Sequence, residues 1–339
     1  MKKFINDPDL VVDEGLEGFL AAHGDRVRVL DSSRVVVRTD LVEGKVGVVS
    51  GGGSGHKPAF LGFTGAGMLD AVVVGEVFTS PTAAAVLEAI EAVDTGAGVL
   101  LLLGNYAGDV MNFRLGADLA REKGHRVELS ISTDDVGAGF HDEPEKRRGV
   151  VGSFLIWKAC GALAQEGASL LEVKELADRV NGVTRTMGVA ISPCTVPAVG
   201  RPTFTLAEDE MELGVGHHGE RGSRTVPLEP VDEIVDILVD EVIKDLPFRS
   251  GDEVATLING LGGTPMIELY VAHRRLLQVL GERGIVVRHQ LVGEFFTALD
   301  MAGFSVTLSK LDEQTTRLLQ APATTAMYTY AGPGPKAAA

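Results

Sequence analysis

Short apolar runs alternate with helical patterns between residues 45 and 131, and each apolar run ends in small or polar residues. This alternation is typical of βαβ units, which form a mainly parallel sheet flanked by helices. The predicted strands are KVGVVS (45–50), DAVVVG (70–75), GVLLLL (98–103) and RVELSI (126–131). Because parallel strands end at the same edge of a sheet, we expect the loops that follow them to meet in one cleft.

The helices between these strands carry start signals. Ser80 is followed by Pro81 and TAAAVLEAIEAV, so it is predicted to cap a helix that begins at Pro81. Another helix is predicted over residues 110–122. A longer helical stretch, 152–181, has the alanines and leucines of a packed helix pair and is expected to close this first domain.

The pattern changes after residue 182, and it predicts a second, smaller α/β domain. After the block RTMGVAISPCTVPAVGRPTF (185–204), residues up to about 229 are rich in loop formers, and helices and strands alternate beyond them. The predicted helices cover 230–244 and 265–283, and the predicted strands are EVATLING (253–260), IVVRHQLVG (285–293) and FSVTLSKLD (304–312). The expected domains are therefore 1–182 and 183–332, both within an α/β fold.

Composition limits the partners that the protein can have. The 339 residues carry a formal net charge of −16, and 45% of them are hydrophobic. Nucleic-acid grooves and anionic membrane faces need clustered Lys and Arg, so neither partner is expected. The two cysteines, Cys160 and Cys194, have no CxxC spacing, and the chain starts without the apolar core of a signal peptide. We expect an acidic, soluble enzyme of the cytoplasm.

Two loops after predicted strands carry candidate chemistry. GGGSGHKP (51–58) lacks the spacing of a Walker A loop and of the dinucleotide-binding fingerprint, but its glycines would let a ligand approach the backbone closely. His56 suits general-base work because imidazole titrates near neutral pH, although a tight turn with an incidental histidine explains the same residues. Asp109, in NYAGDVMNF, either caps the next helix or places a carboxylate near His56.

The stretch GVGHHGERG (214–222) places two histidines side by side between glycines. Adjacent side chains on an extended backbone point to opposite sides, and no HExxH, HxH or cysteine cluster accompanies them, so no metal site is expected. A surface loop without a role and an imidazole that attacks a carbonyl both remain open. Composition does not decide between them.

Eight blocks in order give the chain a family resemblance. They are VVSGGGSGHKPAF, GEVFTSPT, NYAGDVMNF, RRGVVGSFL, RTMGVAISPCTVPAVGRPTF, EDEMELGVGHHGERG, INGLGGTPMIELY and LVGEFFTALDMAGFSVTL. Together they resemble the dihydroxyacetone-binding K subunit of bacterial dihydroxyacetone kinases. The resemblance implies a DAK1/DegV-like fold whose second domain has a mixed sheet. It also implies that the histidine of the GxHGE motif, here His218, holds dihydroxyacetone covalently as a hemiaminal.

The resemblance extends to the remaining site residues. It implies that His56 and Asp109 form an acid/base pair around the hydroxyl that is phosphorylated. It also implies a set of substrate-binding residues: Gly53, Ser54, Gly55, His56, Ser80 and Asp109. Ser80 is equally explained as a helix cap alone. His217 replaces a residue that is often aliphatic in the family. We expect it to be a solvated loop residue, and the alternative is that it belongs to the same remodelling of the pocket as Gly104.

The resemblance also implies partners. No cofactor is expected on this chain, because ADP or ATP with Mg²⁺ would be carried by an L-type subunit that the chain does not contain. The phosphate would come from ATP or from the phosphoenolpyruvate-dependent sugar system, and a homodimer is expected. Two alternatives remain. Gly104 stands where the family commonly has a lysine, which suggests a pocket for a four-carbon ketose such as erythrulose, and some relatives are non-catalytic ketose sensors that activate transcription.

Overall fold

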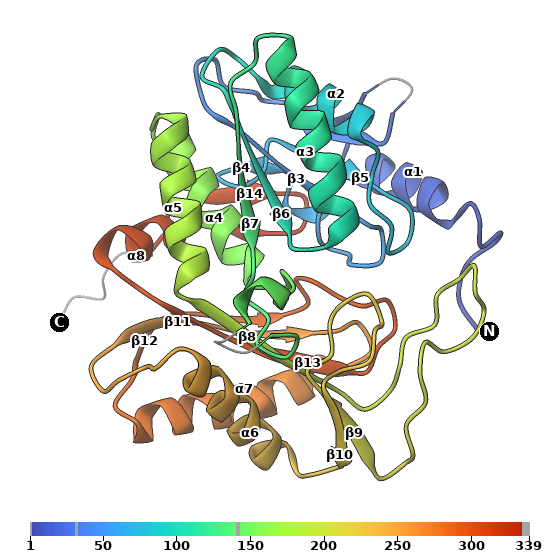
Figure 1. The fold of residues 1–339 in the computed structure, drawn as a ribbon, viewed down its shortest axis with the longest axis vertical. Coiled ribbons are helices and arrows are strands. Elements are labelled where there is room, and N and C mark those ends of the chain that lie inside the picture. The colour runs from blue at the N-terminus through green and yellow to red at the C-terminus, as the bar shows by residue number, and fades with distance from the viewer. Residues whose placement is uncertain (1, 31–32, 140–142, 334–339) are drawn as a thin grey trace.

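The computed structural model describes residues 2–30, 33–139 and 143–333, and two main sheets organise the chain (Figure 1). The first sheet has six strands, of which β5, β3, β6 and β7 run parallel, while β1 and β2 are antiparallel to their neighbours. Its strands in spatial order are β1 (Val27–Val29), β2 (Val35–Arg38), β5 (Ala71–Val74), β3 (Gly47–Gly52), β6 (Val99–Gly104) and β7 (Val127–Ser132). The predicted mainly parallel sheet is confirmed.

Helices cover both faces of this sheet. α2 (Ala83–Val93) and α3 (Ala107–Glu122) pack on one face, and α4 (Ser153–Gln165) and α5 (Leu170–Gly182) pack on the other (Figure 1). Side chains alternate along β6, so that Leu101 joins the core under α2 and α3. Its neighbours on either side belong to the core under α4. Burial on both faces explains why these strands are continuous apolar runs.

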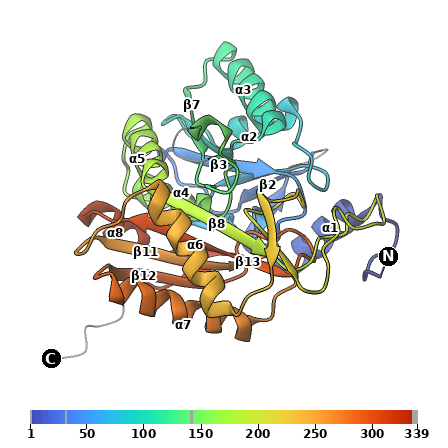
Figure 2. The same cartoon turned by 60° about the horizontal axis from the view of Figure 1, so that its bottom comes forward.

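The second sheet also has six strands and is mixed. β11 and β12 are parallel, whereas β11, β13, β8, β9 and β10 pair antiparallel in turn. In spatial order the strands are β10 (Arg224–Pro227), β9 (Glu210–Leu213), β8 (Thr184–Ala190), β13 (Gly303–Lys310), β11 (Glu253–Gly260) and β12 (Val286–Gly293). α6 (Val231–Asp245) and α7 (Met266–Glu282) cover one face, and the first sheet's unit lies on the opposite side (Figure 2).

The proposed division into domains at residue 182 stays a prediction. α5 ends at Gly182 and β8 begins at Thr184, so a change of sheet does occur there. The last described segment, however, returns to the first half of the chain: α8 (Glu313–Leu319) contacts α4, and β14 (Ala323–Thr325) pairs with β4 (Gly65–Ala66) and with β15 (Thr329–Tyr330). An N-terminal helix, α1 (Val11–His23), packs against the same core.

Two predicted helix starts are wrong. α2 begins at Ala83 and its cap is Thr82, whose side chain accepts a hydrogen bond from the backbone N–H of Ala85, so Ser80 does not cap it. α3 begins at Ala107, earlier than predicted, which places Asp109 inside its first turn instead of at the cap position. The side chains of Ser80 and Asp109 are therefore not used as helix caps.

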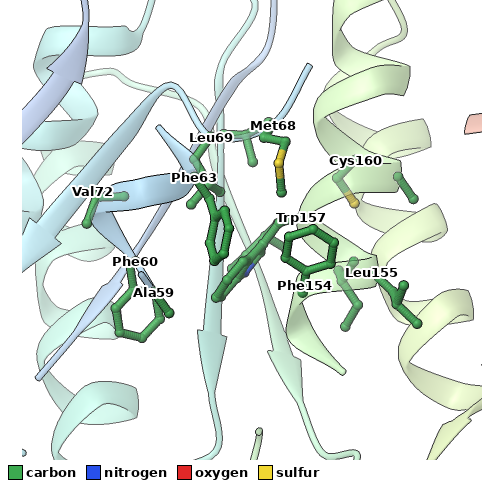
Figure 3. Close-up of a cluster of buried hydrophobic side chains, with 14 of the residues drawn as sticks. Ala59, Phe60, Phe63, Met68, Leu69, Val72, Phe154, Leu155, Trp157 and Cys160 are labelled. Carbon is green, nitrogen blue, oxygen red and sulfur yellow. The ribbon is translucent and has the colours of Figure 1, made fainter. Parts of the chain in front are cut away.

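An aromatic cluster lies between the first sheet and α4 (Figure 3). The Trp157 ring of α4 lies 5.4 Å from that of Phe60 and 5.9 Å from that of Phe63, and only 1% of Trp157 is exposed. Phe296, which follows β12, packs at 5.1 Å against Phe60. This cluster fixes the loop after β3 against the segment after β12, and both contribute to the site described below.

We expect Gly161→Ala to destabilise the protein by about 1–3 kcal/mol, because the α4 backbone touches the segment before β5 there. A Cβ at Gly161 would overlap backbone atoms of Met68, which cannot move aside as a flexible side chain can. Gly18→Ala is the matched control, since Gly18 is an exposed position of α1 where an added Cβ would have no other atom within 4 Å. That control should gain about 0.5–1 kcal/mol from helix propensity. Urea unfolding of both variants measures the difference, and equal midpoints would contradict the close-contact explanation.

Candidate active site

The polar loops after the parallel strands meet the 214–222 segment around one small cavity. The residues that line it are Gly53, His56, Phe60, Gly104, Tyr106, Asp109, Gly149, Ser153, His217, His218 and Phe296. His56 follows β3 and Asp109 follows β6, so the predicted convergence of these loops at one sheet edge is confirmed. The histidine pair arrives from a segment attached to the second sheet.

His56 is held in one tautomer with a free nitrogen in the cavity. Its Nδ1 lies 2.8 Å from the backbone carbonyl oxygen of Thr297. A carbonyl only accepts, so Nδ1 carries the hydrogen and Nε2 keeps its lone pair. Nε2 is buried and has no hydrogen-bond partner among the described residues. Burial, together with the nearby His218, holds the pKa of His56 well below its usual value, so the ring is a neutral proton acceptor.

The glycine-rich loop is packed against the protein itself. A Cβ at Gly53 would lie 2.8 Å from the Cα of Phe78, and one at Gly55 would overlap the Phe78 ring. The Ser54 hydroxyl donates to the carbonyl of Gly75 at 2.7 Å. Gly53 lines the cavity with the histidines, whereas Ser54 and Gly55 line a neighbouring cavity. Residues of the next loop thus approach this backbone closely, and binding of the ketose to Gly53, Ser54 and Gly55 stays a prediction.

His217 and His218 both face His56, contrary to the expectation from an extended backbone. The ring centroids of His217 and His218 lie 4.4 Å and 4.8 Å from that of His56, and 4.9 Å from each other. His217 is only 3% exposed and stacks on Phe296 with centroids 4.1 Å apart, so the prediction of a solvated loop residue is wrong. Its Nδ1 is buried without a partner among the described residues. One ring nitrogen of each of the three histidines lies within 4.8 Å of the others, which is close enough for the three to hold one metal ion.

A charged network orients the His218 loop. Glu220 accepts a 2.8 Å hydrogen bond from the His218 backbone N–H, and Arg148 donates to Glu220 at 2.8 Å and to Asp135 at 2.7 Å. Arg148 also donates to the carbonyl of Gly214. Burial lowers the pKa of His218 to about 4, with Glu220 opposing that shift and Arg148 adding to it. The His218 ring is thus neutral at pH 7 and makes no hydrogen bond with the described residues.

Asp109 is a buried carboxylate with spare hydrogen-bonding capacity. It is 7% exposed, and burial raises its pKa to about 6 although a hydrogen bond with Ser80 opposes the shift. Its Oδ1 has no partner within the described residues. Ser80 accepts a hydrogen bond from Asn112 at 3.2 Å and is absent from the cavity lining, so it contacts the site through Asp109. Asp109 and His56 line the same cavity. The hydrogen bond that orients the His56 ring goes to the Thr297 carbonyl and not to Asp109.

Tyr106 is a site residue that sequence reasoning missed, although it lies in the NYAGD block. Its ring centroid is 4.2 Å from that of His218, and its hydroxyl is buried without a partner in the described part of the chain. Burial raises the pKa of Tyr106 well above its usual value, so the hydroxyl remains a donor. A Cβ at Gly104 would lie 3.0 Å from the Gly149 carbonyl oxygen and 3.2 Å from the Tyr106 ring. The predicted enlargement of the pocket at Gly104 is not supported, because Tyr106 occupies that space.

A mainly parallel sheet and a mixed sheet that enclose a small cavity lined with imidazoles define an α/β protein with a buried polar cavity. The sequence matches the Dak1 domain over residues 17–327, and the chain belongs to the Dak1 family. None of the helices in the described part of the chain has the length and apolar character that a membrane span requires.

Relatives of this family resemble the chain over nearly its whole length. The dihydroxyacetone-binding subunit DhaK of PTS-dependent dihydroxyacetone kinase 1 from Listeria innocua is 45% identical, with 96% of this chain and 99% of that subunit covered. Among solved structures, the dihydroxyacetone kinase operon co-activator Dha-DhaQ has a TM-score of 0.90 at 32% identity, covering 94% of this chain and 99% of its own. The dihydroxyacetone kinase from C. freundii with AMP-PNP and Mg²⁺ has a TM-score of 0.87 at 36% identity, covering 100% of this chain and 63% of its own. The predicted family and fold are confirmed.

Proposed function

We propose that this chain is the dihydroxyacetone-binding subunit of a dihydroxyacetone kinase, a phosphotransferase that acts on the terminal hydroxyl of the ketose. The observation that carries the proposal is the neutral His218 ring, which makes no hydrogen bond to the described residues and faces a buried cavity shared with His56 and Asp109. The Listeria innocua relative is a dihydroxyacetone-binding subunit by name, and the similar C. freundii structure is a dihydroxyacetone kinase. Both support this assignment.

The first step is addition of His218 to the ketone. A lone pair of a neutral ring nitrogen forms a bond to the carbonyl carbon, and the C=O double bond becomes a C–O single bond. The ring then loses the proton of its other nitrogen, and the oxygen gains a proton, so that a neutral hemiaminal results without loss of water. Tyr106 lies close to the His218 ring, and its protonated hydroxyl has no partner among the described residues. This hydroxyl can donate a hydrogen bond to the oxygen of the adduct. Ligands without a carbonyl, such as glycerol, cannot form the adduct.

The second step is attack of the terminal hydroxyl on the phosphoryl group of the donor: a bond forms from the hydroxyl oxygen to phosphorus, the bond from phosphorus to the donor breaks, and the donor leaves with that electron pair. The hydroxyl loses a proton, and two residues that line the cavity can accept it. These acceptors are Nε2 of His56 and Oδ1 of Asp109, neither of which has a hydrogen-bond partner among the described residues. The hemiaminal fixes the position of the hydroxyl, and positioning is the larger part of catalysis in phosphoryl transfer. Ser80 contributes through its hydrogen bond to Asp109.

The nucleotide belongs on a partner subunit in this proposal. The segment 51–55 is buried and packed on residues 73–79, so its glycines offer no open cradle for phosphate oxygens within the described chain. An L-type subunit would carry ADP or ATP with Mg²⁺, which would supply positive charge to offset the charge of the phosphate groups. This chain would supply the acceptor alone and work as a homodimer in the cytoplasm. The net charge of −16 leaves nucleic acid outside its partners.

Ketose sensing without transfer is the competing function, and the Dha-DhaQ structure shows that a co-activator shares this fold. A sensor needs the adduct on His218 but no proton acceptor beside the substrate hydroxyl. The buried carboxylate of Asp109, with its pKa raised to about 6 by burial, favours the kinase, because such a group accepts a proton near neutral pH.

Intact-protein mass spectrometry tests the proposal directly. Incubation with dihydroxyacetone should add the full mass of one ketose per chain, because addition releases no water, and glycerol should add nothing. A matched incubation with erythrulose compares the four-carbon ketose. The same preparation, supplied with an L-type subunit and ATP or a phosphoenolpyruvate system, should form dihydroxyacetone phosphate. Adduct without transfer by either donor would support the sensor, and absence of both adduct and transfer would sink the proposal.

A further inference from the structure

The three imidazoles in the cavity lie close enough together to bind one metal ion after a small rearrangement. His56, His217 and His218 each offer one ring nitrogen, and these atoms all lie within 4.8 Å of one another. Nitrogen ligands about 2.0–2.1 Å from a tetrahedral Zn²⁺ are about 3.3 Å apart. The rings must therefore approach by about 1.5 Å at most, which side-chain rotation and small shifts of the 214–222 loop can supply.

Two of the nitrogens are buried and unused. Nε2 of His56 and Nδ1 of His217 have no hydrogen-bond partner among the described residues, although the two side chains are only 1% and 3% exposed. A buried polar atom without a partner is costly, and native structures pair such atoms with protein, water or an ion. Neutral imidazole nitrogens suit Zn²⁺, Cu²⁺ and Ni²⁺. The cavity therefore offers the donor type that these ions prefer.

His56 also has the orientation of a metal-binding histidine. Its Nδ1–H donates to the backbone carbonyl of Thr297 at 2.8 Å, which fixes the ring and leaves Nε2 without a hydrogen-bond partner among the described residues. Histidine ligands of metal ions usually donate their second ring N–H to a carboxylate or a backbone carbonyl in this way. The His217 ring stacks on Phe296 at an interplanar angle of 16°.

We propose that His56, His217 and His218 bind one divalent transition-metal ion, with Zn²⁺ as the probe, and leave a fourth position for water. Three protein nitrogens and an open position form a known type of zinc coordination. A further consequence rests on the proposed function: because the hemiaminal uses a His218 nitrogen, the metal ion and dihydroxyacetone exclude each other. Zn²⁺ would then inhibit the kinase by occupying the nucleophile, and ketose would protect it.

Binding of Zn²⁺ to tag-free protein, measured by isothermal titration calorimetry, tests the site. Wild type should bind one ion per chain, and His217→Leu should bind at least about 100-fold more weakly, since it removes one ligand but keeps an apolar side chain on Phe296. His23→Ala is the matched control, because His23 lies at the end of α1 and contacts Phe19. Unchanged Zn²⁺ affinity in His217→Leu, or no binding by wild type, overturns the proposal.

Co²⁺ gives a second test on wild-type protein that does not depend on a variant's folding. Bound to three imidazoles and water, Co²⁺ should show intense visible absorption, and dihydroxyacetone should remove that absorption as the adduct forms. Co²⁺ spectra that persist under saturating ketose would leave the metal site standing and contradict the adduct on His218. An adduct in mass spectrometry together with featureless Co²⁺ spectra would contradict the metal site and leave the proposed function standing.

Discussion

His218→Ala should abolish the covalent adduct with dihydroxyacetone and lower phosphoryl transfer by at least about 10²-fold, because the ketose is then neither bound covalently nor held in position. Loss of the imidazole removes the nucleophile but leaves the proton acceptors His56 and Asp109 in the cavity. Intact-protein mass spectrometry reads the adduct, and a coupled assay with the L-type subunit reads the transfer. Thermal unfolding of the variant checks that the loop held by Glu220 remains folded.

Because three imidazoles lie close together, the controls for this prediction must show which of them carries the adduct. His56 and His217 are neutral and lie close to His218, so either could in principle take over the addition. His23→Ala should keep the full adduct, and peptide mapping of the wild-type adduct should place the added mass on residue 218. An adduct that survives His218→Ala and disappears in His217→Leu would move the nucleophile to the neighbouring ring.

The sequence predicted β3, β5, β6 and β7 of the first sheet and β11, β12 and β13 of the second because these elements carry strong local patterns, but it missed β8 in the interior of the second sheet. β3, β5, β6 and β7 are apolar runs between turn residues, and α6 and α7 have apolar residues at helical spacing. β9 and β10 were missed within the loop-rich segment after residue 182. Each has four residues, and β10 is largely exposed, so neither length nor hydrophobic alternation marks it. β9 pairs with β8, and β10 pairs with β9; this pairing, and not local preference, makes them strands.

The site was predictable where it depends on sheet topology and unpredictable where it depends on loop conformation. His56 and Asp109 follow parallel strands, so their convergence required only the order of the elements. The directions of the His217 and His218 rings were misjudged because an extended backbone was assumed. Gly214 and Gly219, with φ of 76° and 74°, bend the chain on both sides of the histidines and direct both rings to His56. The partner that buries His217, Phe296, is distant in the sequence and carries no signal of its own.

Asp109→Asn should lower phosphoryl transfer by about 10²–10⁴-fold and leave the adduct on His218 intact, because it removes a proton acceptor without touching the nucleophile. Burial raises the pKa of Asp109 to about 6, so the carboxylate is ionised above that pH and protonated below it. Wild-type kcat/KM should therefore fall as the pH drops through about 6. The Asn variant should lack this step, since its side chain does not titrate.

Asp118→Asn is the matched control on the same helix, because Asp118 lies on the exposed side of α3 and pairs with Arg121. It should keep both the wild-type rate and the fall of kcat/KM near pH 6. If Asp109→Asn keeps the wild-type rate, Asp109 is not the acceptor and the free Nε2 of His56 takes the proton alone. If it loses the adduct as well, the carboxylate acts earlier, by orienting the ketose for attack by His218, and its raised pKa then governs binding instead of transfer.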